Sequence, residues 1–368
     1  MKNMLITMAL VSLGTLAIAQ KAPSAPVAPA APPMERPTAM PAMYVVPEVP
    51  DVPLAEDLTG IDEQSDDGLT KTFSKTFPAS AADRINVNNQ FGSITIKTWD
   101  RKEVKADVSI SAYSNNADEQ QKLLDGAQVV ADKSGDQINF RTEMNTNRNG
   151  NWGNGTRNGK KWRREVRVNY VLYVPSTCTL NLLQQYGNVE VGSFAGPVNA
   201  KVQYGNFNAQ KLSNSNNNLT VQYGKMTVQD LNRANLKQQY GGGIILGSAR
   251  EINVSAQYSN VNIEKLLGDA AISIQYNNLK IGQVAESARN LSINSQYVRV
   301  DVGFSDQYKG RMDVKTSYCD FRFGSGVAAK IEGDGSRSHT SKNYIGEIGG
   351  GGSGQVSVKS AYGSVTFR

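Results

Sequence analysis

The chain has 368 residues, a formal net charge of +6 and a hydrophobic content of 39%. This mild positive charge is weak evidence for a polyanionic partner. One histidine and two cysteines are too few for a His/Cys metal cluster, and we expect no metal or other cofactor.

The first residues are typical of a secretory signal peptide. Lys2 precedes an apolar run over residues 4–19, and residues 17–19 form a small-x-small cleavage motif. The apolar core is too short for a membrane anchor. We therefore predict a signal peptide over residues 1–19 and an exported protein, located in the periplasm, on the cell surface or in the medium.

Residues 20–70 differ sharply in composition from the rest of the chain. Ten of the thirteen prolines lie between Pro23 and Pro53, and residues 48–67 are acidic without any lysine or arginine. Such a segment buries too little apolar surface to offset its ordering entropy. The composition predicts a disordered Pro/Ala-rich and then acidic linker; a proline-motif ligand is the alternative.

Residues 71–180 are expected to form an N-terminal β part and cap. Residues 90–96 read as an early copy of the later repeat, with Phe91 in place of tyrosine. Apolar residues at helical spacing behind Asn116 predict a short helix over residues 116–132. Residues 137–141 and 165–174 are predicted to pair as strands across a long loop. We expect this region to seal one end of a stack of repeats.

The long loop is the one concentrated charged feature. Residues 141–167 hold eight lysines and arginines, two glutamates and two of the three tryptophans. Tryptophan and arginine are enriched where binding energy concentrates, and the pair suits an anionic glycan, phospholipid headgroups or nucleic acid. The candidate contact residues of this basic loop (142–164) are Trp152, Arg157, Lys160, Lys161, Trp162, Arg163 and Arg164.

Other interpretations of the basic loop remain open. It could be a solvent-exposed hairpin without a binding role, since long surface loops cost little conformational entropy. The acidic residues 48–67 could also fold over it, at modest strength in salt. An anionic glycan or another envelope component is the expected partner, and no specific nucleic acid is indicated.

The dominant pattern of the chain is a repeat of Gln-Tyr. It recurs in steps of 18, 19, 17, 18, 18 and 21 residues, and degenerate copies follow at Tyr318 and Tyr362. In each unit two alternating apolar runs flank a polar break, which predicts strand, corner, strand and turn. The expected ladder residues are Tyr186, Tyr204, Tyr223, Tyr240, Tyr258, Tyr276, Tyr297 and Tyr318.

This repeat predicts an all-β fold, namely a single-stranded, β-helix-like solenoid with coils of about 18–21 residues over residues 181–368. One short N-terminal helix and one long hairpin loop would complete it. Equivalent residues would form Tyr, Gln and Asn ladders. Counting alternate positions puts the tyrosines on the side of isoleucine and valine, so we expect an internal column. A sugar-binding aromatic strip would instead require rings that face solvent.

The two cysteines lie about seven units apart. Stacked strands advance ~4.8 Å each, so the thiols would be ~30 Å or more apart, while a disulfide requires Cα atoms within about 7 Å. We therefore predict that Cys178 and Cys319 are unpaired, buried and inert.

No catalytic set emerges from the sequence. The single histidine, His339, lies in a Ser/Thr/Arg-rich stretch, and no G-x-S-x-G elbow is present. A polysaccharide lyase or hydrolase would need clustered carboxylates. The acids of the repeats are expected not to share one position of the unit: Glu190, Asp230, Glu264, Asp301 and Asp320.

Several segments resemble a known family. They are residues 91–96, residues 168–175 leading into residues 180–182, and the Tyr-Gly-Asn-Val type of unit that follows. Together they resemble exported bacterial β-strand-repeat proteins called putative adhesins, which carry head-domain-like repeats and mostly lack an assigned activity. The resemblance covers roughly residues 71–368 and implies a β-solenoid in the cell envelope, with no catalytic residues to transfer.

The sequence thus favours a non-enzymatic exported β-solenoid that acts as an adhesin or structural envelope module. A polyanion- or glycan-binding protein acting through the basic loop is the alternative. A polysaccharide-active enzyme is a third, weaker hypothesis.

Overall fold

The computed structural model describes residues 68–145, 152–157, 159–332 and 340–368, all within the compact unit Val46–Arg368. The predicted signal peptide and nearly all of the predicted linker lie outside the described residues. Among the helices of the described part, none is long and apolar enough to cross a membrane.

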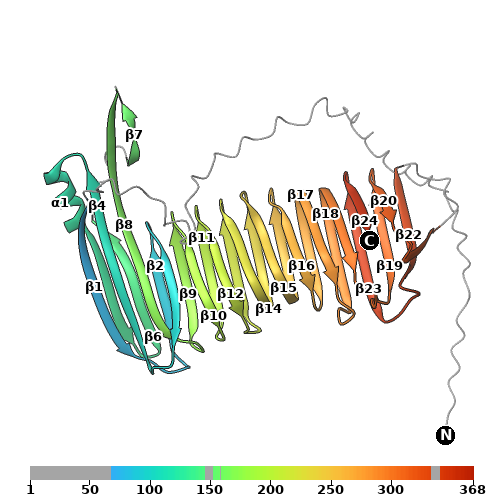
Figure 1. The fold of residues 1–368 in the computed structure, drawn as a ribbon, viewed down its shortest axis with the longest axis horizontal. Coiled ribbons are helices and arrows are strands. Elements are labelled where there is room, and N and C mark those ends of the chain that lie inside the picture. Colours follow the sequence, from blue (N-terminus) through green and yellow to red (C-terminus); the bar gives the residue numbers. More distant parts are fainter. Residues whose placement is uncertain (1–67, 146–151, 158, 333–339) are drawn as a thin grey trace, which may run out of the picture. The chain divides into compact units, whose positions relative to one another are not determined.

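The described chain is nearly all β, with a single helix (Figure 1). The N-terminal elements are β1 (Leu69–Pro78), β2 (Arg84–Asn89), β3 (Ile94–Trp99), β4 (Glu103–Ser114), α1 (Ala117–Gly126), β5 (Ala127–Ser134), β6 (Gln137–Met144), β7 (Gly153–Arg157) and β8 (Lys160–Pro175). The repeat strands are β9 (Thr179–Gln185), β10 (Val189–Phe194), β11 (Val198–Gln203), β12 (Phe207–Leu212), β13 (Asn217–Gln222), β14 (Lys225–Gln239), β15 (Gly243–Gln257), β16 (Val261–Leu266), β17 (Ala270–Val284) and β18 (Asn290–Phe304). The C-terminal strands are β19 (Gly310–Ser317), β20 (Asp320–Phe323), β21 (Val327–Ile331), β22 (Ser341–Ile348), β23 (Gly354–Ala361) and β24 (Ser364–Phe367).

Each repeat contributes one strand segment to each of two parallel ladders. In the first ladder β11 pairs with β9 and β13, so that Asn199 faces Asn181 and Asn218. In the second ladder β12 pairs with β10 and β14. Some strands run through a corner and belong to both ladders, so the hydrogen bonding joins all of the described strands into one mixed sheet.

The hydrophobic core is built from the inward side chains of both ladders. Burial alternates along the arms, as in β13, where Leu219 and Val221 are buried and their neighbours are not. The buried residues of both ladders form one continuous cluster. Alternation with period two therefore gives each arm one buried face, as the sequence predicts.

The N-terminal strands cover the edges of the first repeat-like unit. β6 pairs in parallel with β2 and antiparallel with β5, while β8 pairs in parallel with β3 and antiparallel with β4. β1 pairs antiparallel with β4, and α1 packs against β4, β1, β8 and β5. Figure 1 shows α1 beside β4 at this end of the stack.

Two expectations for this region are wrong. The helix ends at Gly126 rather than at 132, although Asn116 caps it through the Glu119 N–H at 2.9 Å. Glycine favours helix termination, and the next residues pair as β5 with β6. The strands over 137–141 and 165–174 do not pair with each other, because β6 joins the first ladder and β8 the second.

The C-terminal repeats stack out of chain order. β23 pairs with both β18 and β19, so the Tyr362 unit lies between the units of Tyr297 and Tyr318. β22 then pairs antiparallel with β19 and with β21. The C-terminal part therefore departs from the predicted single-stranded coil, in which the repeats would stack in sequence order. The antiparallel β22 occupies the edge of β19 that a further repeat would need.

Both cysteines are unpaired, as predicted, but only Cys178 is buried. Burial, together with the nearby Asp83 carboxylate, raises the pKa of Cys178 to about 11. Cys319 is partly exposed, so the expectation of burial is wrong for this thiol.

Candidate binding surface

Each ladder tyrosine sits at the corner between the two ladders, in an unusual backbone conformation. Nine tyrosines have φ between 50° and 60°: Tyr186, Tyr204, Tyr223, Tyr240, Tyr258, Tyr276, Tyr297, Tyr318 and Tyr362. Non-glycine residues seldom adopt this left-handed region, and bulky ones less often still. The corner keeps its hydrogen bonding, since the Tyr204 N–H donates to the Gln222 carbonyl at 2.9 Å.

The rings of these tyrosines form one continuous aromatic column. From Phe91 through Tyr186 to Tyr318, neighbouring ring centroids are 4.5–5.4 Å apart with interplanar angles of 3–15°. Stacked pairs contribute about 0.5–1.5 kcal/mol each beyond burial. The predicted register of the tyrosines and the substitution by Phe91 are confirmed, with Tyr362 inserted before Tyr318.

The expectation that this column is internal is wrong. Seven of the nine column tyrosines are exposed, from 36% of the residue surface for Tyr276 to 54% for Tyr318, and the other two, Tyr223 and Tyr240, are half-buried. A positive φ rotates the tyrosine out of the strand alternation, so counting odd and even positions fails at the corner. The ring faces cover one another, so the ring edges and hydroxyls meet solvent.

The N-terminal end of the column is closed by Trp152 of the basic loop, the residue directly before β7. Trp152 stacks on Phe91 with centroids 6.0 Å apart and an angle of 4°. The Arg164 guanidinium lies 4.9 Å from the Trp152 ring centroid, and its Nε donates to Glu119 of α1 at 2.7 Å. The Ser114 hydroxyl and Arg164 outweigh desolvation and lower the pKa of Glu119. The ladder tyrosines and the basic loop are separate features of the sequence. In the structure, Trp152 and Arg164 connect them.

The other predicted loop residues divide into two groups. Arg163 pairs with Glu165 and lies 3.5 Å from the Tyr113 ring centroid, while Trp162 faces Gly155 across the hairpin. Arg157, Lys160 and Lys161 lie in β7 and β8, but their side chains are outside the described part. Arg163 and Arg164, whose side chains are described, therefore make contacts within the protein.

A second periodic surface covers the outward face of the first ladder. The sequence predicted its asparagine and glutamine ladders but not the row of side chains between them. Asparagine side chains donate to one another from repeat to repeat at 2.7–3.0 Å, in the order Asn253, Asn235, Asn218, Asn199, Asn181, Asn86 and Asn139. Nearer the column, Gln222, Gln239, Gln257 and Gln275 form a similar row at 2.8–3.3 Å.

A central row lies between the asparagines and the glutamines. It runs Arg141, Asn88, Leu183, Lys201, Thr220, Lys237, Ser255, Ser273, Asn294, Lys359 and Lys315. We call these three rows together the amide face. Two shallow hollows of about 530 and 510 Å³ lie along it and share Asn218 and Thr220.

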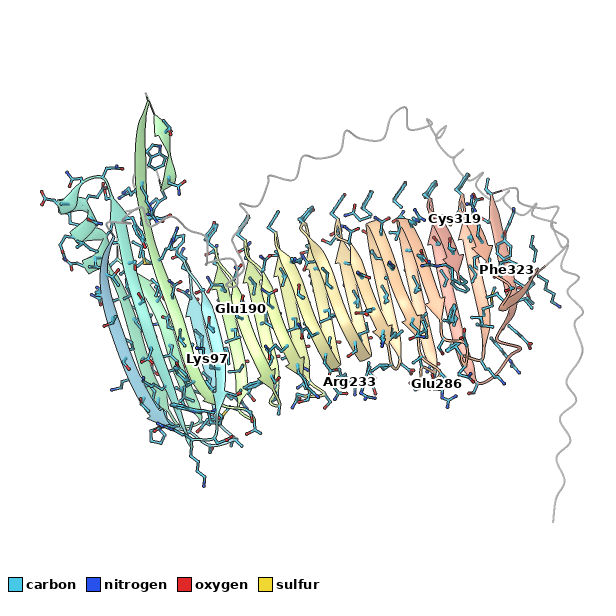
Figure 2. The ribbon with its side chains drawn as sticks, viewed as in Figure 1. Lys97, Glu190, Arg233, Glu286, Cys319 and Phe323 are labelled. Atoms are coloured by element: carbon cyan, nitrogen blue, oxygen red, sulfur yellow. The ribbon has the colours of Figure 1, made fainter. Side chains whose placement is uncertain are left out.

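The edge opposite the column is charged. Arg233 pairs with Glu251 at 3.3 Å. Figure 2 shows Arg233 and Glu286 along the edge opposite Cys319, the residue that follows Tyr318. The outward face of the second ladder is also mixed in charge, since Lys211 pairs with Asp230 at 3.4 Å.

Carboxylates do not gather into a catalytic pair on the second ladder. As expected, the five acids of the repeats do not share one position of the unit. Glu190 and Asp301 do coincide, but the row between them holds Asn208, Thr227, Ile245, Asn262 and Lys280. Six strand spacings of ~4.8 Å place the two acids about 29 Å apart. Within the described chain no group of three or more His, Cys, Asp or Glu could hold a metal, and His339 lies outside it.

Comparisons with known proteins give only distant likenesses. No family model matches the chain, and no curated protein matches it. A crystal structure named a cell adhesion protein of Clostridium sporogenes has a TM-score of 0.23 and 8% identity over 81% of this chain and 99% of its own. A structure named a putative adhesin from Bacteroides fragilis has a TM-score of 0.28 and 11% identity over 81% of this chain and 97% of its own. A structure named a lipid binding protein from Parabacteroides distasonis gives 0.27 and 14% over 64% and 94%. Similarity at these values establishes neither a shared fold nor a shared function.

Proposed function

We propose that this protein is an exported, non-enzymatic β-solenoid that acts as an adhesive or structural module of the cell envelope. The observation that carries the proposal is the unbroken aromatic column beside the amide rows. The column presents a tyrosine at every repeat, and the rows present an amide at several consecutive repeats. Such a surface suits a ligand that is itself repetitive, because one contact can then recur along its length.

The solenoid description rests on the register of the parallel ladders. From β9 to β18 each arm pairs with the equivalent arm one repeat on. Stacked repeats of this kind bury a core only through their neighbours, so the covering strands and α1 at one end and the β21–β22 hairpin at the other serve as caps.

Three features argue for binding rather than catalysis. Glu190 and Asp301, which share one position of the unit on the second ladder, are about 29 Å apart, too far to act as an acid and base on one bond. The amide side chains have no titratable group. The exposed phenols are stacked on one another, which favours rigidity over chemistry.

The proposal can be tested with the mature chain on an array of bacterial and host glycans, combined with a reducing-end assay on every glycan it retains. We expect retention of at least one glycan class and no release of new reducing ends. Release of ends would identify an enzyme, and retention of no class would contradict an adhesive role. Fractionation of the producing cells, with N-terminal sequencing of the mature protein, tests the predicted export and cleavage after Ala19.

Binding of polyanions through the basic loop is a weaker candidate. Arg163 and Arg164 are engaged with Glu165 and Glu119, so the idea depends on Arg157, Lys160 and Lys161. Neutral replacements at these three positions should abolish retention on heparin if the loop is the contact. Unchanged retention would remove this candidate.

A further inference from the structure

The amide face differs from the other surfaces of the repeats in its charge. Between β2 and β23, where every residue of its three rows is described, no row position holds a carboxylate. The central row carries Lys201, Lys237 and Lys359 over the same strands. Arg141 and Lys315 extend the row at its two ends, where they pair with Glu143 and Asp313. The face is therefore polar and one-sidedly basic.

Two of these lysines are regularly placed. Lys201 faces Thr220, and Thr220 faces Lys237. Two strand spacings thus separate the lysines, which is about 10 Å. Both are exposed, and neither belongs to an ion pair among the described residues.

The lysines also line the hollows of this face. Lys201 lines one hollow with Asn181 and Asn199, and Lys237 lines the other with Asn235 and Asn253. In the middle of the asparagine row each amide uses one N–H and one oxygen lone pair to reach its neighbours; these residues are Asn181, Asn199, Asn218 and Asn235. The second N–H and the remaining lone pair of these four amides are left for a ligand.

We propose that the amide face binds a linear acidic polysaccharide that runs along the stack, with carboxylates recurring about every 10 Å. This inference rests on the proposed function and specifies its ligand. Sugar hydroxyls would exchange hydrogen bonds with the amide rows, and carboxylates would meet Lys201 and Lys237. A single-stranded nucleic acid fits less well, because its bases need open aromatic faces and the faces in the column are already stacked.

The test uses the mature chain and immobilised hyaluronan oligosaccharides, which carry one carboxylate per disaccharide. Carboxyl-reduced hyaluronan is the neutral control. We expect binding to hyaluronan that weakens with salt, and at least about tenfold weaker binding to the reduced polymer. Equal binding to both polymers would overturn the assignment of an acidic ligand.

Matched variants locate the site. The double variant Lys201→Gln/Lys237→Gln should weaken hyaluronan binding about tenfold or more. Lys265→Gln/Lys280→Gln removes the same charge from exposed positions of the second ladder and should leave binding within about twofold. Equal losses in both variants, with unchanged thermal unfolding, would show that net charge and not this face is responsible.

Further experiments distinguish the other possible ligands of the amide face. Retention of a neutral glycan alone would leave the proposed function standing and overturn this inference, whereas retention of no glycan would contradict both this inference and the adhesive role. Equally strong binding of a single-stranded oligodeoxynucleotide, lost in the same variant, would overturn specificity for a polysaccharide. If hyaluronan binds only after deletion of residues 48–67, the proposal is overturned for the full chain. The acidic segment would then be the occupant of the amide face.

Discussion

The ring of Trp152 lies on the ring of Phe91 with an interplanar angle of 4°. Trp152 belongs to the basic loop, and Phe91 occupies the tyrosine position of the earliest repeat-like unit. Arg164 covers Trp152 and is itself held by Glu119 of α1. The helix, the hairpin and the aromatic column therefore form one connected structure at this end of the stack.

The first prediction concerns this cap. Trp152→Ala should expose one face of Phe91 and destabilise the first unit by about 1 kcal/mol. Hydrogen exchange should then accelerate in β2 and β3, while the repeats near Tyr258 keep their protection. Trp162→Phe, a change in the same hairpin, serves as the control. Uniform loss of protection along the whole chain would contradict a local capping role.

The second prediction concerns the corner conformation of the tyrosines. Tyr258→Phe should leave the free energy of unfolding nearly unchanged, because the ring and its two stacks at 5.1 and 4.5 Å remain. Tyr258→Val should destabilise by about 2–4 kcal/mol, since a β-branched residue resists positive φ and both stacks are lost. Tyr258→Asn tolerates this φ and should fall between them. Urea unfolding of the three variants measures the order, and equal effects of Val and Asn would argue against backbone strain.

The third prediction concerns the glycine that follows the tyrosine in several repeats. A Cβ atom at Gly205 would overlap the backbone carbonyl of Gly187 in the neighbouring repeat. Gly205→Ala should therefore destabilise by about 2–4 kcal/mol. Gly326→Ala meets no atom within 4 Å and should be nearly neutral. Thermal unfolding compares the two, and similar midpoints would mean that the corner relaxes freely.

The fourth prediction concerns the nearly buried Asp83. Burial opposes its ionisation, but the Ser80 N–H at 2.7 Å and the Lys133 ammonium at 3.3 Å outweigh burial and lower its pKa. A carboxylate with a lowered folded pKa stabilises above its unfolded pKa, near 4, and loses that contribution as pH falls through the folded value. Asp83→Asn should destabilise by about 1–3 kcal/mol at pH 7 and have a progressively smaller effect below about pH 4. Urea unfolding at pH 7, 4 and 3 measures this, and a penalty independent of pH would contradict the assignment.

The fifth prediction concerns the two thiols. Cys178 is buried with a pKa raised to about 11, whereas Cys319 is partly exposed. A maleimide at pH 7.5 should therefore label Cys319 in the native protein and leave Cys178 unmodified until unfolding. Mass spectrometry of tryptic peptides identifies the site. Labelling of Cys178 at a comparable rate would show that this end of the core opens readily.

Strand alternation and fixed spacing were enough to predict the all-β repeat, its period, the stacking of equivalent tyrosines and the place of Phe91 in the column. Three features became visible only in the folded chain, because residue spacing does not encode them. The left-handed corner turned the tyrosines outward, β23 entered the stack ahead of β19, and Trp152 reached the column across a long interval of chain. Each depends on backbone conformation or on pairing between distant segments, and local pattern constrains neither.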